Sequence, residues 1–196
     1  VYSKSVEAFF RNHGYTYSRM NPLEANLQMA KMRRHKTDHS DAHELAKTHF
    51  KMEREATYVQ EDYYEQMRAL TRYYDEMDEE MIVLKSRMHA ILHMSFPELE
   101  KLITPSSALF LNIVQLYPHP ALVLSHSKTV IKNRLKANTK KNLSLTRAEK
   151  KALELIEAAQ NSYPAIKPTD VRCDQVKDYA SRIAELKEKK EALIQQ

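Results

Sequence analysis

Two stretches with a heptad repeat constrain the fold of this chain more than any other feature. In the first, apolar side chains recur at alternating steps of three and four, at Met67, Leu70, Tyr74, Met77, Met81, Leu84, Met88 and Ile91. The same spacing returns near the C-terminus at Val176, Tyr179, Ile183, Leu186, Lys190 and Leu193. A stripe with this period needs a partner helix to cover it. We expect two long helices that pair with each other, antiparallel within one chain, or each with a helix of a second chain.

The composition favours helices in the rest of the chain as well. The 196 residues include one glycine, Gly14, and no tryptophan. Tight hairpins usually need glycine, so a sheet built from such hairpins is excluded. Apolar residues make up 42% of the chain, enough for one or two buried cores. We predict a mostly α protein.

The first fifty residues show a mixed pattern. A helix over residues 2–12 should end at Gly14, because glycine readily adopts the left-handed cap conformation. The alternating aromatic residues 15–20 predict a short strand, and a helix should follow over residues 21–32. Its inward side chains are expected to be Leu23, Leu27 and Ala30. Helix, strand and helix in this order indicate part of an α/β domain.

Prolines divide the region between the two heptad stretches. They stand at positions 97, 105, 118, 120, 164 and 168. Proline interrupts helices, which leaves short helices near residues 106–117, 120–137 and 146–162. We expect a small helical insertion at the tip of a helical hairpin.

Charge is distributed unevenly along the chain. Residues 121–151 hold nine Lys or Arg and one acid, Glu149, whereas residues 53–80 hold ten acids and three arginines. A basic stretch beside an acidic one is typical of a protein that offers one surface to a polyanion. The residues predicted to contact a polyanion are Lys128, Lys132, Arg134, Lys136, Lys140 and Lys141.

Two aspartates lie within another basic segment, RRHKTDHSDAHELA. Thr37 predicts an N-cap, which places Asp38 and Asp41 in the first turn of a helix and on one side of it. Two close carboxylates repel each other unless a cation neutralises them, so the pair is a candidate for half of a magnesium site. The alternative is that both acids only stabilise the positive end of the helix.

Histidines in the same segment offer a competing site. His39 and His43 have the spacing of a zinc-binding pair, and His35 extends their stripe. The alternative is a stripe of exposed or phosphate-facing histidines. His89 and His93 repeat the spacing beside the first heptad stretch, where we expect packing or solvation.

The sequence contains one cysteine, Cys173, which excludes an internal disulfide. We find neither a signal peptide nor an apolar run of the roughly 20 residues that cross a bilayer. We therefore expect a cytoplasmic, nucleoid-associated protein without membrane contact.

The segment NPLEANLQMAKMRRHKTDHSDAHELAKTHF resembles the end of the RuvC-like domain of DEDD-type insertion-sequence transposases, the bridge-RNA-guided recombinases related to the Piv and MooV invertases. The pattern KTDxxDAxxLA is its most specific part, and VYSKSVEAFFRNHGYTYSRMNP also matches. The resemblance implies that Asp38 and Asp41 are the last two acids of the DEDD set. It further implies that the chain is a fragment without the N-terminal strands, the other two acids and the C-terminal serine transposase domain.

From this resemblance we expect residues 1–52 to be the rear part of an RNase H-like (RuvC-like) domain. Residues 53–196 would form a coiled-coil linker, with heptad stretches at about 60–93 and 172–196 and a basic helical insertion at 95–170. The implied activity is RNA-guided DNA strand cleavage and exchange with Mg²⁺, for which Asp38 and Asp41 are the catalytic and metal-binding residues. The fragment alone should be inactive.

The implied partners are DNA, a guide RNA and further copies of the chain, held through the coiled coil. Basic residues around the acids would bind the DNA backbone: Arg33, Arg34, Lys36 and Lys47. The alternative function is a non-catalytic helical scaffold for nucleic-acid binding or dimerisation. A zinc protein that uses His39 and His43 is a third hypothesis.

Overall fold

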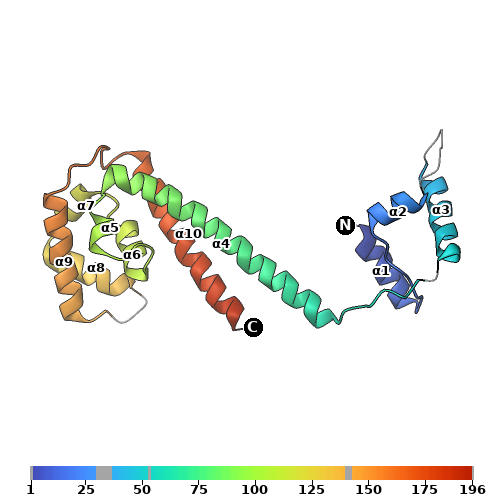
Figure 1. Cartoon of the computed structure of the whole chain (residues 1–196). Coiled ribbons are helices and arrows are strands. Elements are labelled where there is room, and N and C mark those ends of the chain that lie inside the picture. Colours follow the sequence, from blue (N-terminus) through green and yellow to red (C-terminus); the bar gives the residue numbers. More distant parts are fainter. Residues whose placement is uncertain (1, 30–36, 53, 140–142, 196) are drawn as a thin grey trace. The chain divides into compact units, whose positions relative to one another are not determined.

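The computed structural model describes residues 2–29, 37–52, 54–139 and 143–195 (Figure 1). The chain divides into two compact units, residues 1–65 and 66–196. The described residues form helices and contain no strand. The prediction of a mostly α fold is therefore confirmed, while the RNase H-like origin of residues 1–52 stays a prediction.

The first unit contains α1 (Tyr2–Asn12), α2 (Pro22–Met29) and α3 (Asp38–Lys51). Helix α1 ends as predicted, because Gly14 adopts a φ of 70° that other residues disfavour. The strand predicted over residues 15–20 does not form. Instead this segment bonds to residues 55–57: Thr57 N donates to Tyr17 O (2.9 Å) and Ser18 Oγ donates to Glu55 O (2.7 Å). Two such contacts do not make the repeated ladder of a sheet.

Helix α2 does not turn its leucines inward, contrary to the prediction. Leu23 and Leu27 are 67% and 69% exposed, and Ala30 lies outside the described residues. Glu24, which is half exposed, and Gln28, which is partly buried, both bind Arg54: its guanidinium lies 3.4 Å from Glu24 Oε1 and 2.5 Å from Gln28 Oε1. An arginine that is largely buried needs such partners. The spacing of apolar residues in α2 does not predict these contacts with Arg54.

The second unit is built on two long helices, α4 (Asp62–Ser95) and α10 (Val171–Ile194) (Figure 1). They run antiparallel. Arg172, near the start of α10, donates to Met94 Sδ near the end of α4 (3.5 Å), and Arg182 pairs with Glu80 (2.6 Å) further back along α4. The heptad residues that become buried are Met77, Met81, Leu84, Met88, Ile91, Val176, Ile183, Leu186 and Lys190. The two stripes thus cover each other within the chain.

Five shorter helices form the tip of this hairpin. They are α5 (Leu99–Leu102), α6 (Ala108–Leu116), α7 (Pro120–Leu124), α8 (Lys128–Asn138) and α9 (Leu145–Gln160). Helix α6 packs on α10, and α9 packs on α5, α7 and α8. The helix predicted over 120–137 is two helices, because the Ser127 hydroxyl accepts a bond from Val130 N and caps a new start.

One apolar core runs through the hairpin and the tip. Phe96, Phe110 and Tyr117 of the tip region are fully buried in the same cluster as Met88 of α4 and Ile183 of α10. The tip is therefore anchored to both long helices, which fixes the orientation of α8 and α9.

Candidate nucleic-acid interface

The aspartate pair lies at the N-terminus of α3, as predicted. Thr37 caps the helix: its hydroxyl accepts a bond from Ser40 N (3.2 Å), and Thr37 N donates to Ser40 Oγ (3.2 Å). This reciprocal pair is a capping box. Asp38 is exposed and Asp41 is partly buried, and their spacing places both carboxylates on one side of the first turn.

The pair is a candidate for part of a metal site. Magnesium is commonly held by one or two protein carboxylates together with water and substrate phosphates. Two aspartates one turn apart could supply these carboxylates. In the described part of the chain, no group of three or more His, Cys, Asp or Glu side chains is placed to hold a metal ion. The same turn also fits the alternative of two acids at the positive end of a helix.

The basic residues expected around the acids are only partly described. Arg33, Arg34 and Lys36 lie outside the described residues. Lys47 follows Asp38 by nine positions, which puts it on the opposite face of α3, and its ammonium pairs with Glu44 Oε1 (3.2 Å). The structure thus does not bring Lys47 to the aspartate pair.

The histidine pairs are separate from any cluster of ligands. His39 and His43 are exposed on α3, and the absence of a third ligand among the described residues applies to them too; His35 lies outside these residues. His89 pairs with the Glu100 carboxylate, and His93 is exposed.

The basic residues of the tip lie mainly along α8. Ile131 and Leu135 are buried, which fixes the rotation of the helix. Lys128, Lys132 and Lys136 recur every four residues and follow one flank. Arg134 lies on the other flank, and Lys140 and Lys141 lie outside the described residues. Between the two flanks Thr129, Asn133 and Ala137 face solvent.

Glu149 of α9 is part of the same surface. Its Oε1 lies 2.6 Å from Lys128 Nζ. The hydrogen bond and the charge of Lys128, with a further contribution from the charge of Lys132, lower the pKa of Glu149. Arg147 and Lys150 of α9 are exposed as well. Both belong to the basic stretch of residues 121–151, but neither was among the residues predicted to contact a polyanion.

No helix in the described part of the chain is both long and apolar enough to span a membrane.

Comparison with family models gives two matches. Residues 1–97, which hold the aspartate pair and all of α4, match a transposase family, the DEDD transposases of the IS110 type. Residues 73–195, which hold most of α4, the tip and α10, match the family described as snoRNA binding domain, fibrillarin. No match was found among curated proteins or solved structures. Residues 1–97 belong to the IS110-type transposase family, and residues 73–195, which form most of the hairpin and the whole tip, belong to the snoRNA-binding domain family.

Proposed function

We propose that this chain is the part of an RNA-guided transposase that joins a metal-dependent DNA-cleaving domain to an RNA-binding arm. The observation that supports it best is the overlap of the two family matches on a single helix, α4. The transposase match runs into α4 from the N-terminal side, and the snoRNA-binding match begins within it. Helix α4 thus belongs to both matched regions.

In this proposal residues 1–52 are the rear part of a RuvC-like domain, and residues 53–196 are the linker and arm. Asp38 and Asp41 hold a divalent metal ion, Mg²⁺, together with two further acids of the DEDD set. When bound there, such an ion would supply Lewis-acid polarisation of a phosphodiester and charge stabilisation for the departing oxygen. The Thr37 capping box holds the first turn of α3 in place, so both carboxylates keep one orientation toward the DNA backbone. Two acids of four leave the chain inactive by itself.

The tip binds the phosphate backbone of a structured RNA. Its cations need only recognise shape and charge, because base pairing between guide and target reads the sequence. Lys128, Lys132 and Lys136 on one flank of α8 and Arg134 on the other provide such contacts. The exposed residues between them are small, which allows the helix to approach a nucleic-acid strand closely.

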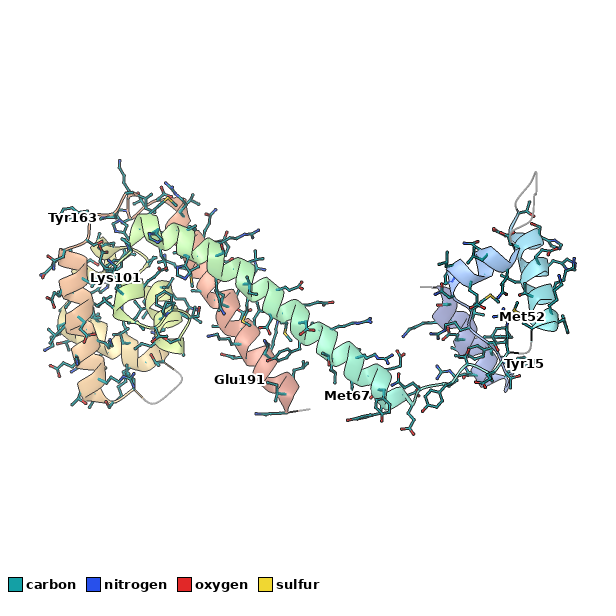
Figure 2. All side chains as sticks on the ribbon, viewed as in Figure 1. Tyr15, Met52, Met67, Lys101, Tyr163 and Glu191 are labelled. Carbon is teal, nitrogen blue, oxygen red and sulfur yellow. The ribbon has the colours of Figure 1, made fainter. Side chains whose placement is uncertain are left out.

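Association of two chains is a separate part of the proposal. The first turns of α4 extend beyond the end of α10, and Met67 in this part is 45% exposed (Figures 1 and 2). Tyr73, beside the last turns of α10, is 48% exposed. These residues are available to a second chain.

The decisive experiment replaces Asp38→Asn in the full-length transposase and measures strand transfer with guide RNA and Mg²⁺. We expect activity to fall by at least 10²-fold, since an amide binds the cation poorly, while RNA binding stays unchanged. Asp75→Asn on α4 removes the same charge far along the sequence and serves as the matched control. Full strand transfer by the Asp38→Asn variant would contradict the proposal.

The scaffold alternative is favoured by one observation, the placement of both aspartates in a capped first turn where they stabilise the helix without any ligand. Under that alternative, Asp38→Asn leaves strand transfer intact, and neutralising the α8 lysines abolishes nucleic-acid binding. Strand transfer by the Asp38→Asn variant separates the two functions, because both of them place nucleic-acid binding on the α8 lysines.

A further inference from the structure

Glu149 is the one acid among residues 121–151, and it lies against the most basic helix of the tip. Its carboxylate reaches across from α9 to the first residue of α8, where Oε1 lies 2.6 Å from Lys128 Nζ. Both side chains remain partly open to solvent, at 42% for Lys128 and 47% for Glu149. The contact is therefore within reach of a ligand from outside.

Lys128 is the first of three evenly spaced cations. Lys132 and Lys136 follow at steps of four residues, which is a rise of about 6 Å per step along an α-helix. This step is similar to the distance between successive phosphates of one nucleic-acid strand. A strand laid along the flank of α8 would thus bring one phosphate to each lysine. The Glu149 carboxylate binds Lys128, where the first phosphate of such a strand would lie.

We propose that Glu149 is an internal substitute for an RNA phosphate: it holds Lys128 in the free protein, and a bound strand displaces it. This inference rests on the proposed RNA binding by the tip, and it adds that the Glu149 carboxylate regulates this binding by competing for Lys128. The charge of Lys132 also acts on Glu149, so the carboxylate lies within the field of two of the three lysines.

Displacement is feasible because an exposed ion pair is weak and is screened by salt. The lysine ammonium carries three donors and can pass from a carboxylate to a phosphate oxygen without moving its stem. An isolated phosphate gains little binding free energy by this exchange, because Lys128 already has the Glu149 carboxylate as a partner. A continuous strand also reaches Lys132 and Lys136, and those contacts favour the exchange. Glu149 thereby selects strands over isolated anions.

The test measures binding of the full chain to a short RNA duplex over a series of salt concentrations, with a DNA duplex of the same sequence as the second arm. We expect Glu149→Gln to tighten RNA binding about threefold or more with an unchanged salt slope. Lys128→Gln should weaken binding and reduce the slope by about 0.9, the loss of one phosphate contact. When Glu149→Gln is combined with Lys128→Gln, most of the gain in RNA affinity that Glu149→Gln gives alone should be lost.

Glu154→Gln is the matched control, because Glu154 lies on the same helix and pairs with Lys151 Nζ (2.7 Å) instead of α8. It raises the net charge by the same amount, and we expect a smaller gain in affinity. An equal gain in both variants would overturn the inference, as would a Lys128→Gln variant with the salt slope of the unmodified chain. If the unmodified chain binds no RNA, the proposed function itself fails. Tighter binding to DNA than to RNA refutes the assignment to RNA.

Discussion

Lys190 of α10 lies over the aromatic ring of Tyr74 on α4, with its ammonium 3.7 Å from the ring centroid. The same ammonium pairs with the Asp78 carboxylate one turn along α4. A lysine in an apolar stripe usually weakens a coiled coil, yet here 91% of the residue is buried with two partners supplied by the opposite helix. This contact ties the last turns of α10 to one register on α4.

The Lys190 contact gives the first prediction. Lys190→Ala removes the cation–π contact and the ion pair together and leaves a gap in the stripe, so we expect a loss of about 1–2 kcal/mol in the free energy of unfolding. Lys190→Met keeps an unbranched apolar chain over the ring and should cost less than about 1 kcal/mol. Urea denaturation followed by circular dichroism measures both. A larger loss for Met than for Ala would contradict this account.

The shared core gives a second prediction. Met88 is fully buried between α4, α10 and the tip, and Met88→Ala should lower the free energy of unfolding by about 2–5 kcal/mol. Ile82 lies on the same helix but is 65% exposed, so Ile82→Ala should change it by no more than about 0.5 kcal/mol. We expect a single thermal transition for residues of α4 and the tip. Two separate transitions would show that the tip folds independently.

The capping box at α3 gives a third prediction. Thr37→Ala removes the acceptor for Ser40 N, and we expect it to destabilise the helix by about 1 kcal/mol. Thr37→Ser keeps the hydroxyl and serves as the control. Hydrogen exchange of the Ser40 amide reports on this turn directly: it should accelerate in the alanine variant and not in the serine variant.

The start of α10 gives a prediction on pH. Asp170 caps the helix by accepting from Arg172 N (2.9 Å), and the Arg172 guanidinium binds the same carboxylate at 2.7–2.8 Å. The hydrogen bonds from the Arg172 side chain and backbone lower the pKa of Asp170 from 3.8 to about 2. A carboxyl whose pKa is lower in the folded state stabilises that state above its unfolded pKa. This contribution is lost as the pH falls from about 4 to 2.

Asp170→Asn should therefore lower the melting temperature at pH 6 and flatten its fall between pH 4 and pH 2. Asp174→Asn is the control, because Asp174 lies one turn later and is largely exposed. Melting temperatures across this pH range test the expectation. An Asn variant with the unmodified pH profile would assign the acid sensitivity to other groups.

The long helices could be predicted from the sequence because the heptad period itself marks the buried face. Spacing alone assigns Met81 and Ile183 to the interface. It does not identify the partner, since a second stripe in the same chain and a copy of the same stripe are chemically alike. Contacts such as Arg182 with Glu80 favour pairing within the chain over pairing with a second copy. Such contacts depend on the register of two helices about a hundred residues apart in the sequence.

Local chemistry explains which parts of the candidate site were predictable. The Thr37 cap depends on neighbours within one turn, so the start of α3 followed from the sequence. The side of α2 that binds Arg54 did not, because Arg54 selects Glu24 and Gln28 through contacts that only the folded unit creates. The pairing of Lys128 with Glu149 likewise depends on how α8 packs against α9. The only sequence feature that pointed to this pair was a single acid, Glu149, in a basic stretch.

The continuity of the core from α4 and α10 into the tip has a mechanical consequence. Phe96 and Phe110 are embedded in the same packed interior as the two long helices, so the described residues of the tip share one core with α4 and α10. A force that a bound strand exerts on α8 would therefore also act on the helix pair, and it would reach the opposite end of α4 as a rotation or a displacement.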